Sequence, residues 1–396
     1  GGVMADKTRR LYMACAFAVT LLFSLGNTTQ GTLLTEFAEH YGIGTLPQSF
    51  ISAAASFGMA ASLLLLLSGL IRITKNALFV VAVAMLGGAL GLIGTMPAFP
   101  VFIALYALLG VSFGFIDAIG SSLIADVSAP DTVGRNMGML HAFYGIGGIL
   151  GPLLIRATAS FAAGSGKGGA GAAAFLLSAF GAALFVFNLY TYRSVRRYLP
   201  AAVKYPERPR AAGLSAFLRS GAVPLLLICG LNGVYINIIT FRTAQYVTVE
   251  FGSSVLGALA VSTFWAGTVI SRFTIPRMRL NFRAYLVGSL LGAGALTALG
   301  VLLGSAYSAI AAVFLAGLIS GAVTPLCMGE LCMMVPENTL LGSASALLSQ
   351  YVVSLTGTLL AGALTPNDML GAGLYFAAGY SALGAIAGAF YKKNVG

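Results

Sequence analysis

The sequence predicts an all-α membrane protein with twelve transmembrane helices in two pseudo-symmetric six-helix bundles. First, hydrophobic residues make up 58% of the 396 residues and charged residues only 8%, a composition typical of membrane proteins. Second, apolar runs of about 20 residues recur along the chain, and a helix of that length crosses a bilayer. Third, one long basic connector divides these runs into two sets of six.

Short polar or basic segments separate the expected spans. The spans cover residues 11–37, 47–70, 77–96, 99–127, 136–161, 170–195, 222–248, 254–275, 284–304, 307–334, 341–363 and 369–391. Glycines recur four residues apart within them, as at Gly87 and Gly91 or Gly317 and Gly321. Because lipid supplies no hydrophobic drive for helix association, such small residues indicate helices that pack closely.

The connector at residues 196–221 is rich in proline and arginine and ends in a short amphipathic piece. The sequence repeats weakly across it, since Arg72-Ile-Thr recurs as Arg272-Phe-Thr. An internal duplication of this kind is typical of secondary transporters. The predicted organisation is a cytoplasmic N-terminus at 1–10, six-helix bundles at 11–195 and 222–391, a cytoplasmic central loop at 196–221 and a cytoplasmic C-terminus at 392–396.

The net charge of +11 sets the expected orientation of the chain. If the N-terminus is cytoplasmic, all of the 22 basic residues except Arg156, Lys167 and Arg242 fall on the cytoplasmic side. The positive-inside rule therefore places both termini in the cytoplasm. The basic residues lie in short clusters between apolar runs, without aromatic residues interleaved on a soluble face, so no nucleic-acid partner is expected.

The sequence contains no recognisable catalytic or metal-binding motif. The four cysteines lie within spans and have no histidines at metal-ligand spacing, so neither zinc nor a disulfide framework is expected. We expect no cofactor and a driving force from an ion gradient, with a proton as the coupling ion and sodium as the alternative. Short outer segments without a glycosylation sequon fit a bacterial inner (plasma) membrane. We expect the chain to be a monomer in the lipid bilayer.

Asp117 lies in the apolar run at residues 110–126, and the functional interpretation depends on it. At about 100° per residue it shares a helix face with Gly110, Gly114 and Ser121, so it faces another helix or water rather than lipid. A carboxylate near the bilayer centre costs about 2.5–3.5 kcal/mol on insertion scales, so it persists where it lines a cavity, finds a partner or carries a proton. We expect Asp117 to carry the coupling proton. The alternative is a helix-packing acid that a neighbouring hydroxyl satisfies.

Polar side chains concentrate in a few spans and predict a shared aqueous pocket for a small-molecule substrate. The candidates for substrate contact are Asn27, Gln30, Asn232, Tyr235, Arg242, Trp265, Thr324 and Gln350. Amides and hydroxyls would bind the hydroxyl groups of a solute, while Arg242 would bind an anionic group or gate the outer side. Each has a structural alternative: interhelical hydrogen bonds for the polar groups, snorkelling for Arg242 and aromatic packing for Trp265.

Further charged or titratable residues toward the ends of spans are candidates for gating. They are His141, Arg156 and Glu330. For His141, which lies close to the cytoplasmic side, a capping or core role competes with proton relay. Glu330 falls off the helix face of Gly317 and Thr324, so we expect a cytoplasmic gate or an end-of-helix contact rather than a substrate ligand.

Three motifs point to one family of membrane proteins. They are Gly114-Phe-Ile-Asp117, the glycine-rich run from His141 to Pro152, and Phe264-Trp-Ala-Gly followed by Arg272. Together with the six-plus-six spans and the basic connector, they resemble the major facilitator superfamily, and within it the fucose:proton symporter-like and sodium-dependent glucose transporter-like branch. The resemblance implies the major facilitator fold, rocker-switch alternating access, a central site lined by spans one, four, seven and ten, and Asp117 as the coupling acid.

Two departures from the superfamily's pattern bear on gating and coupling. The loop after span two keeps Arg72 but lacks the aspartate of the superfamily's loop motif, and Arg72 and Arg272 are further gating candidates. The acid that fucose-type symporters carry in span one is replaced by Asn27 and Gln30. We therefore expect coupling through one acid rather than two.

The expected function is secondary active transport of a small polar solute, a sugar or sugar derivative, with a proton carried on Asp117. The alternative is a proton-driven exporter of drugs or metabolites, because Gly147 to Pro152 resembles the Gly-Pro motif of such exporters. A third class, a non-transporting receptor or scaffold on the same fold, would bind no solute.

Overall fold

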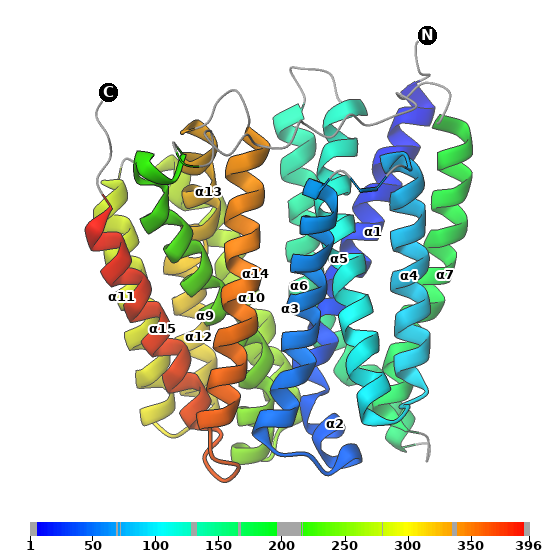
Figure 1. The fold of residues 1–396 in the computed structure, drawn as a ribbon. Helices are drawn as coiled ribbons and strands as arrows, with labels where there is room; N and C mark the ends of the chain where they lie inside the picture. Colours follow the sequence, from blue (N-terminus) through cyan, green and yellow to red (C-terminus); the bar gives the residue numbers. More distant parts are fainter. Residues whose placement is uncertain are drawn as a thin grey trace. The chain divides into compact units, whose positions relative to one another are not determined.

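The chain is described here by a computed structural model covering residues 6–68, 70–71, 73–127, 133–164, 168–195, 215, 217–278, 280–334 and 339–391. Nearly all of these residues are helical (Figure 1). Within this part of the chain, 12 helical segments are long and apolar enough to cross a membrane. The predicted fold class and the twelve spans are therefore confirmed.

The chain divides into two compact units, which we call the first and the second unit. The first unit comprises Gly1–Thr29 and Phe57–Tyr205, and the second comprises Gln30–Ser56 and Pro206–Gly396. Residues 30–56, which the sequence analysis assigns to the first bundle, thus group with the second unit. The contacts responsible are given with the candidate site below.

Long helices build the first unit. They are α1 (Asp6–Thr32), the later part of α3 (Thr45–Ser68), α4 (Lys75–Gly94), α5 (Phe99–Val127), α6 (Val133–Gly164) and α7 (Gly169–Val195). Helices α4 and α7 lie side by side (Figure 1). The Ser178 hydroxyl on α7 donates to the carbonyl oxygen of Gly87 on α4 at 2.8 Å. A Cβ on Gly181 would lie 2.8 Å from the Cα of Gly87, so the two backbones meet directly, as the spaced glycines predict.

The second unit contains the remaining helices. They are α2 (Leu34–Tyr41), the early part of α3, η1 (Leu218–Ala222), α9 (Val223–Phe251), α10 (Ser254–Thr274), η2 (Ile275–Arg277), α11 (Phe282–Leu302), α12 (Ala306–Ser320), α13 (Val323–Met333), α14 (Thr339–Leu364) and α15 (Gly371–Phe390). Helix α9 packs against α14 and α15, and α10 packs against α12 (Figure 1). Leu225, Cys229, Leu290 and Cys327 belong to the buried core between these helices.

Side-chain caps fix several helix starts. Thr74, Ser253 and Asn281 each accept a hydrogen bond from the backbone N–H three residues on, at 3.3, 3.2 and 2.9 Å. Gly42 and Gly252 follow the ends of α2 and α9 with φ of 61° and 69°, a left-handed conformation that glycine adopts without a Cβ clash. The capping side chains mark where α4, α10 and α11 begin, and the two glycines mark where α2 and α9 end.

Span ten departs from the single helix expected at 307–334, because it divides into α12 and α13 around Gly321 and Ala322. Pro325 explains the break, since it has no N–H to donate to the carbonyl oxygen four residues earlier, that of Gly321. The Arg272 Nε on α10 donates to that oxygen instead, at 3.3 Å. Ser271 Oγ accepts from the Ala322 N–H at 3.2 Å. Side chains of α10 therefore bind both the Gly321 carbonyl and the Ala322 N–H at the break.

Candidate functional site

Asp117 and His141 form the titratable part of the candidate site in the first unit. Asp117 on α5 is half-buried, His141 on α6 is exposed, and the two groups interact electrostatically. Tyr144 lies one turn along α6 from His141 and accepts a hydrogen bond from the Asn27 Nδ2 on α1 at 3.3 Å. Three predicted site residues, Asn27, Asp117 and His141, therefore lie on three neighbouring helices of one unit.

The gating role predicted for the two arginines of the first half, Arg156 and Arg72, stays a prediction. Arg156 lies on α6 and is buried. Arg72 lies outside the described residues, so its predicted gating role stays a prediction.

The candidate substrate residues Asn232 and Tyr235 on α9 contact other helices of the second unit. The Asn232 Nδ2 donates to the Thr324 hydroxyl on α13 at 2.9 Å, while the Asn232 Oδ1 is buried without a hydrogen-bond partner in the described part of the chain. The Tyr235 hydroxyl shares a hydrogen bond of 2.9 Å with Thr297 on α11, and its side chain is fully buried. Asn232 and Thr324 are thus brought together, whereas Tyr235 is enclosed by packing.

Three further predicted substrate residues of the second unit are Gln350, Trp265 and Gln30, and each lies at least partly inside the protein. Gln350 on α14 is half-buried, and a Cβ on Gly233 would lie 3.3 Å from its Cα. Trp265 on α10 is buried and packs edge-on against Phe264, with ring centroids 5.8 Å apart. Gln30 is buried near the end of α1.

Arg242 on α9 is buried, with 4% of its surface exposed, and it joins α9 to α3. Its Nη1 donates to the Oε1 of Gln48 at 2.5 Å and to the Oε1 of Gln245 at 3.1 Å. Its Nη2 donates to the carbonyl oxygen of Thr45 and to the hydroxyl of Ser49, both at 2.7 Å. We call these five residues the Arg242 cluster. The cluster explains why the beginning of α3 groups with the second unit.

Two further polar contacts strengthen this grouping. Asn237 on α9 accepts from the Ser52 hydroxyl at 2.6 Å and from the Thr358 hydroxyl on α14 at 3.2 Å. The Asn367 side chain, between α14 and α15, accepts from the Thr45 N–H at 2.8 Å.

The partners of Arg242 on α3 were not selected from the sequence, although a signal for them exists. Thr45, Gln48, Ser49 and Ser52 recur at i, i+3, i+4 and i+7, so they form one polar helix face at the end of an apolar span. Such a face predicts a polar contact with another helix. Its partner on α9 could not be inferred, because it lies about 190 residues away in the chain.

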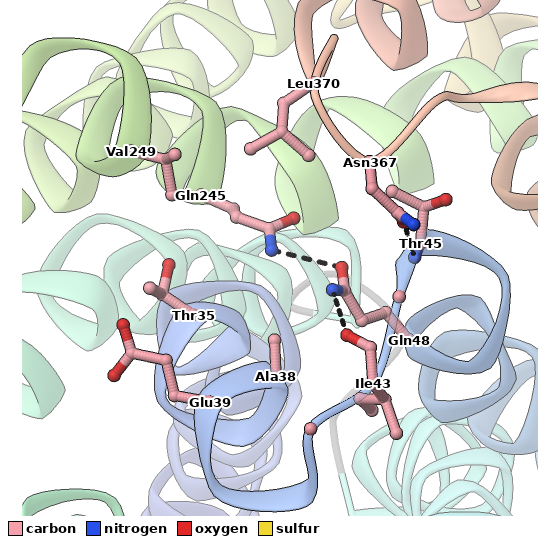
Figure 2. A pocket seen from close by; sticks show the side chains of 12 residues that line it. Thr35, Ala38, Glu39, Ile43, Thr45, Gln48, Gln245, Val249, Asn367 and Leu370 are labelled. Atoms are coloured by element: carbon pink, nitrogen blue, oxygen red, sulfur yellow. Dashed lines mark hydrogen bonds between the residues drawn. The ribbon is translucent and has the colours of Figure 1, made fainter.

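A pocket of about 400 Å³ adjoins the Arg242 cluster in the second unit (Figure 2). Helix α2 contributes Thr35 and Glu39, and Asn367 lies on another wall. Gln48 and Gln245 point toward each other across the pocket, and the Gln245 Nε2 donates to the Gln48 Oε1 at 3.1 Å. Both amides also accept from Arg242, so the pocket reaches the hydrogen-bond partners of this buried cation.

The other two predicted gating residues, Arg272 and Glu330, lie on α10 and α13 of the second unit. Arg272 donates to the broken part of span ten, as described above. Glu330 on α13 is half-buried and interacts electrostatically with Tyr391, which directly follows α15. Burial, with a further contribution from Glu330, raises the pKa of the Tyr391 phenol. The gating or end-of-helix role expected for Glu330 stays a prediction.

Comparisons with known proteins agree with this architecture. The sequence model described as the Major Facilitator Superfamily matches residues 16–278. A search of curated proteins gives no match. Among solved structures, a D-xylose-proton symporter aligns with a TM-score of 0.72 at 13% identity, covering 96% of this chain and 97% of the symporter.

A bacterial homologue of the human lysosomal transporter Spinster is also similar. Its inward-facing, unoccupied structure aligns with a TM-score of 0.70 at 12% identity, covering 98% of this chain and 97% of the homologue. Its inward-facing, occupied structure aligns with a TM-score of 0.66 at 13% identity over the same shares. At these identities the likeness concerns the fold.

Proposed function

The chain belongs to the major facilitator superfamily and is a multi-pass membrane transporter rather than an enzyme, and from this premise we propose that it is a proton-coupled secondary transporter of a sugar or sugar derivative. The proposal includes alternating access, and it assigns the chain to the fucose:proton symporter-like branch. The motifs around Asp117, His141 and Trp265 support that branch. The likeness in fold to a D-xylose-proton symporter is compatible with it.

The half-buried position of Asp117 inside an apolar helix is the observation that carries the proposal. A carboxylate inside an apolar helix is costly unless it is compensated, and here it is half-buried next to an exposed titratable group. A carboxylate in this position can take up a proton when its surroundings are wet and retain it when they close. Because span one supplies Asn27 and Gln30 instead of an acid, Asp117 acts as the single coupling acid.

Substrate hydroxyls would be bound by amides and hydroxyls in the two units. We assign this role to Asn27, Gln30, Asn232, Thr324 and Gln350. The half-satisfied Asn232 amide is the best supported, because its buried Oδ1 accepts no hydrogen bond in the described residues and is available to a ligand donor. Tyr235 and Trp265 are assigned to packing, since their side chains are enclosed by neighbours.

The distribution of charge supports an orientation with both termini in the cytoplasm. In that orientation the Arg242 cluster lies toward the outer side and Glu330 toward the cytoplasmic side. We propose a bacterial inner membrane, a monomer, and no cofactor besides the coupling ion, which is a proton with sodium as the alternative.

Replacing Asp117 by asparagine tests the proposal. The full-length chain is reconstituted in proteoliposomes, and uptake of labelled D-xylose, L-fucose and D-glucose is measured with and without an inward proton gradient. We expect Asp117→Asn to abolish gradient-driven accumulation while exchange of the sugar across the membrane persists, because the amide is neutral at every pH. Asp368→Asn, which removes an exposed carboxylate outside the spans, is the matched control and should accumulate sugar as the wild type does.

Undiminished accumulation by Asp117→Asn would exclude Asp117 as the coupling acid. A sodium gradient applied at constant pH separates the two coupling ions. If the sugar accumulates under the sodium gradient alone, the coupling ion is sodium rather than a proton.

The second candidate function is proton-driven export, and the packing of α6 favours it. Pro152 lies inside α6, and a Cβ on Gly147 or Gly151 would lie 2.5 Å from side-chain atoms of Ser24 or Thr28 on α1. The Gly-Pro segment thus forms a close helix contact, as its motif suggests for exporters. The direction of transport separates the candidates, because a symporter moves solute with the proton and an exporter moves it against the proton.

A further inference from the structure

Arg242 is a buried cation, and the four hydrogen bonds that it donates within the described part of the chain all go to neutral oxygens. The two ion pairs found among the described residues join Asp6 to Arg9 and Arg10, so neither involves Arg242. Hydrogen bonds to an ionised acceptor are about twice as strong as those to a neutral one, and a buried charge is stabilised most by an opposite charge. In this conformation the charge of Arg242 is solvated by amides and a hydroxyl rather than neutralised.

Three of these four hydrogen bonds go to a different helix. Thr45, Gln48 and Ser49 belong to α3, whereas Gln245 lies on α9, one turn from Arg242 itself. If α3 separates from α9 during alternating access, the guanidinium keeps one partner and exposes at least three N–H groups. A solute that binds when α3 and α9 are apart must supply acceptors for these N–H groups in place of Thr45, Gln48 and Ser49.

The pocket beside the cluster reaches two of the hydrogen-bond partners of Arg242. Gln48 and Gln245 line this pocket and both accept from Arg242, so a solute in the pocket lies next to the partners of the guanidinium (Figure 2). The acidic residue on the pocket wall, Glu39, is exposed, and Figure 2 shows its side chain pointing away from the two glutamines. Solvent screens an exposed carboxylate, whereas the buried charge of Arg242 is screened much less.

We propose that Arg242 selects an anionic substrate, a sugar acid or a similar hydroxylated carboxylate, whose carboxylate takes the N–H groups that Thr45, Gln48 and Ser49 occupy in the closed cluster. This inference rests on the proposed function and narrows its substrate class. The planar guanidinium offers two parallel N–H groups to a carboxylate, which the ammonium of lysine cannot do. Substrate binding then competes with closure of α3 on α9.

The test compares solutes that differ in one carboxylate. The pairs are glucose and glucuronate, galactose and galacturonate, and glycerol and glycerate. Thermal stabilisation of the detergent-solubilised full-length chain is measured against concentration. We expect at least one acid to give half-maximal stabilisation at about tenfold lower concentration than its neutral partner, the difference expected when neutral contacts become charge-assisted ones.

Substitutions at Arg242 show whether the guanidinium causes the preference. Arg242→Gln should remove the preference for the acid. Arg242→Lys should retain part of this preference, because lysine keeps the positive charge but lacks the two parallel N–H groups of the guanidinium. Ser49→Ala is the matched control, since it removes a competing acceptor and leaves the guanidinium intact. It should bind the acid at least as tightly as the wild type. Each shift is measured from the variant's own unliganded Tm, so that a loss of stability does not imitate a loss of binding.

Three results would overturn the inference: equal effects of acid and neutral partner, no stabilisation of the wild type by any of the six solutes, or an acid preference that survives in Arg242→Gln. Proton-driven accumulation of a neutral sugar without acid preference would overturn the anionic substrate and leave the proposed function standing. An Arg242-dependent preference for the acid without proton-driven uptake would overturn the proposed proton coupling and leave the anionic substrate standing.

Discussion

Tyr235 and Asn232 lie three residues apart on α9, yet their surroundings differ. The Tyr235 hydroxyl is hydrogen-bonded to Thr297 inside the second unit, and its side chain has no exposed surface. Asn232 donates to Thr324 but leaves its acceptor oxygen unused in the described part of the structure. Both side chains carry hydrogen-bonding groups. Only the packing against α11 and α13 therefore distinguishes a structural group from a candidate ligand.

We predict that Tyr235→Phe lowers stability without impairing recognition of the transported solute. Removing one buried hydrogen bond costs about 0.5–1.5 kcal/mol, so Tm should fall while the KM for uptake changes by less than about twofold. Asn232→Ala should instead raise KM. A tenfold rise in KM for Tyr235→Phe would assign Tyr235 to the substrate site.

At the scale of elements, span ten shows how a proline divides a helix without unfolding it. Pro325 removes the hydrogen bond expected at the Gly321 carbonyl, and Arg272 supplies another donor. The Tyr285 hydroxyl on α11 donates to the Ile319 carbonyl at 3.0 Å. Helices α10 and α11 therefore hold the break between α12 and α13 in a fixed geometry.

We predict that Pro325 and Arg272 are energetically coupled. Arg272→Gln should lower the free energy of unfolding more in the wild type, where the Gly321 carbonyl would lose its donor, than in Pro325→Ala, where the backbone N–H of the introduced alanine can replace it. The expected coupling is on the order of 1 kcal/mol, measured from the Tm of both single variants and the double variant. Additive effects would mean that Arg272 stabilises the break through another contact.

At the scale of the whole molecule, hydropathy and glycine spacing were sufficient to predict the fold class and the twelve spans. Pro325 also predicts the break in span ten, whereas the continuous apolar run around it predicts one helix. The grouping of residues 30–56 with the second unit could not be read from periodicity. It depends on contacts such as Arg242 with Gln48, and helical periodicity shows which face is polar without showing which helix it meets.

We predict that joining α3 to α9 at the Arg242 cluster stops transport. In the variant Gln48→Cys/Gln245→Cys, a short thiol-specific cross-linker should lower uptake by at least about tenfold, because alternating access requires this contact to open. Dithiothreitol should restore uptake if the linker contains a disulfide. Of the four native cysteines, Cys15, Cys229 and Cys327 are buried, and the side chain of Cys332 lies outside the described part of the structure. Gln48→Cys alone and Gln245→Cys alone, each treated with the reagent, are the controls. Full uptake after complete cross-linking would show that α3 and α9 stay together throughout the cycle.

The contact between α4 and α7 has a consequence for the response to the bilayer. The two backbones meet at Gly87 and Gly181, and the Ser178 hydrogen bond to the Gly87 carbonyl holds the helices together at this point. In a membrane of different thickness we therefore expect α4 and α7 to tilt together, because their close contact opposes sliding or separation of the two helices.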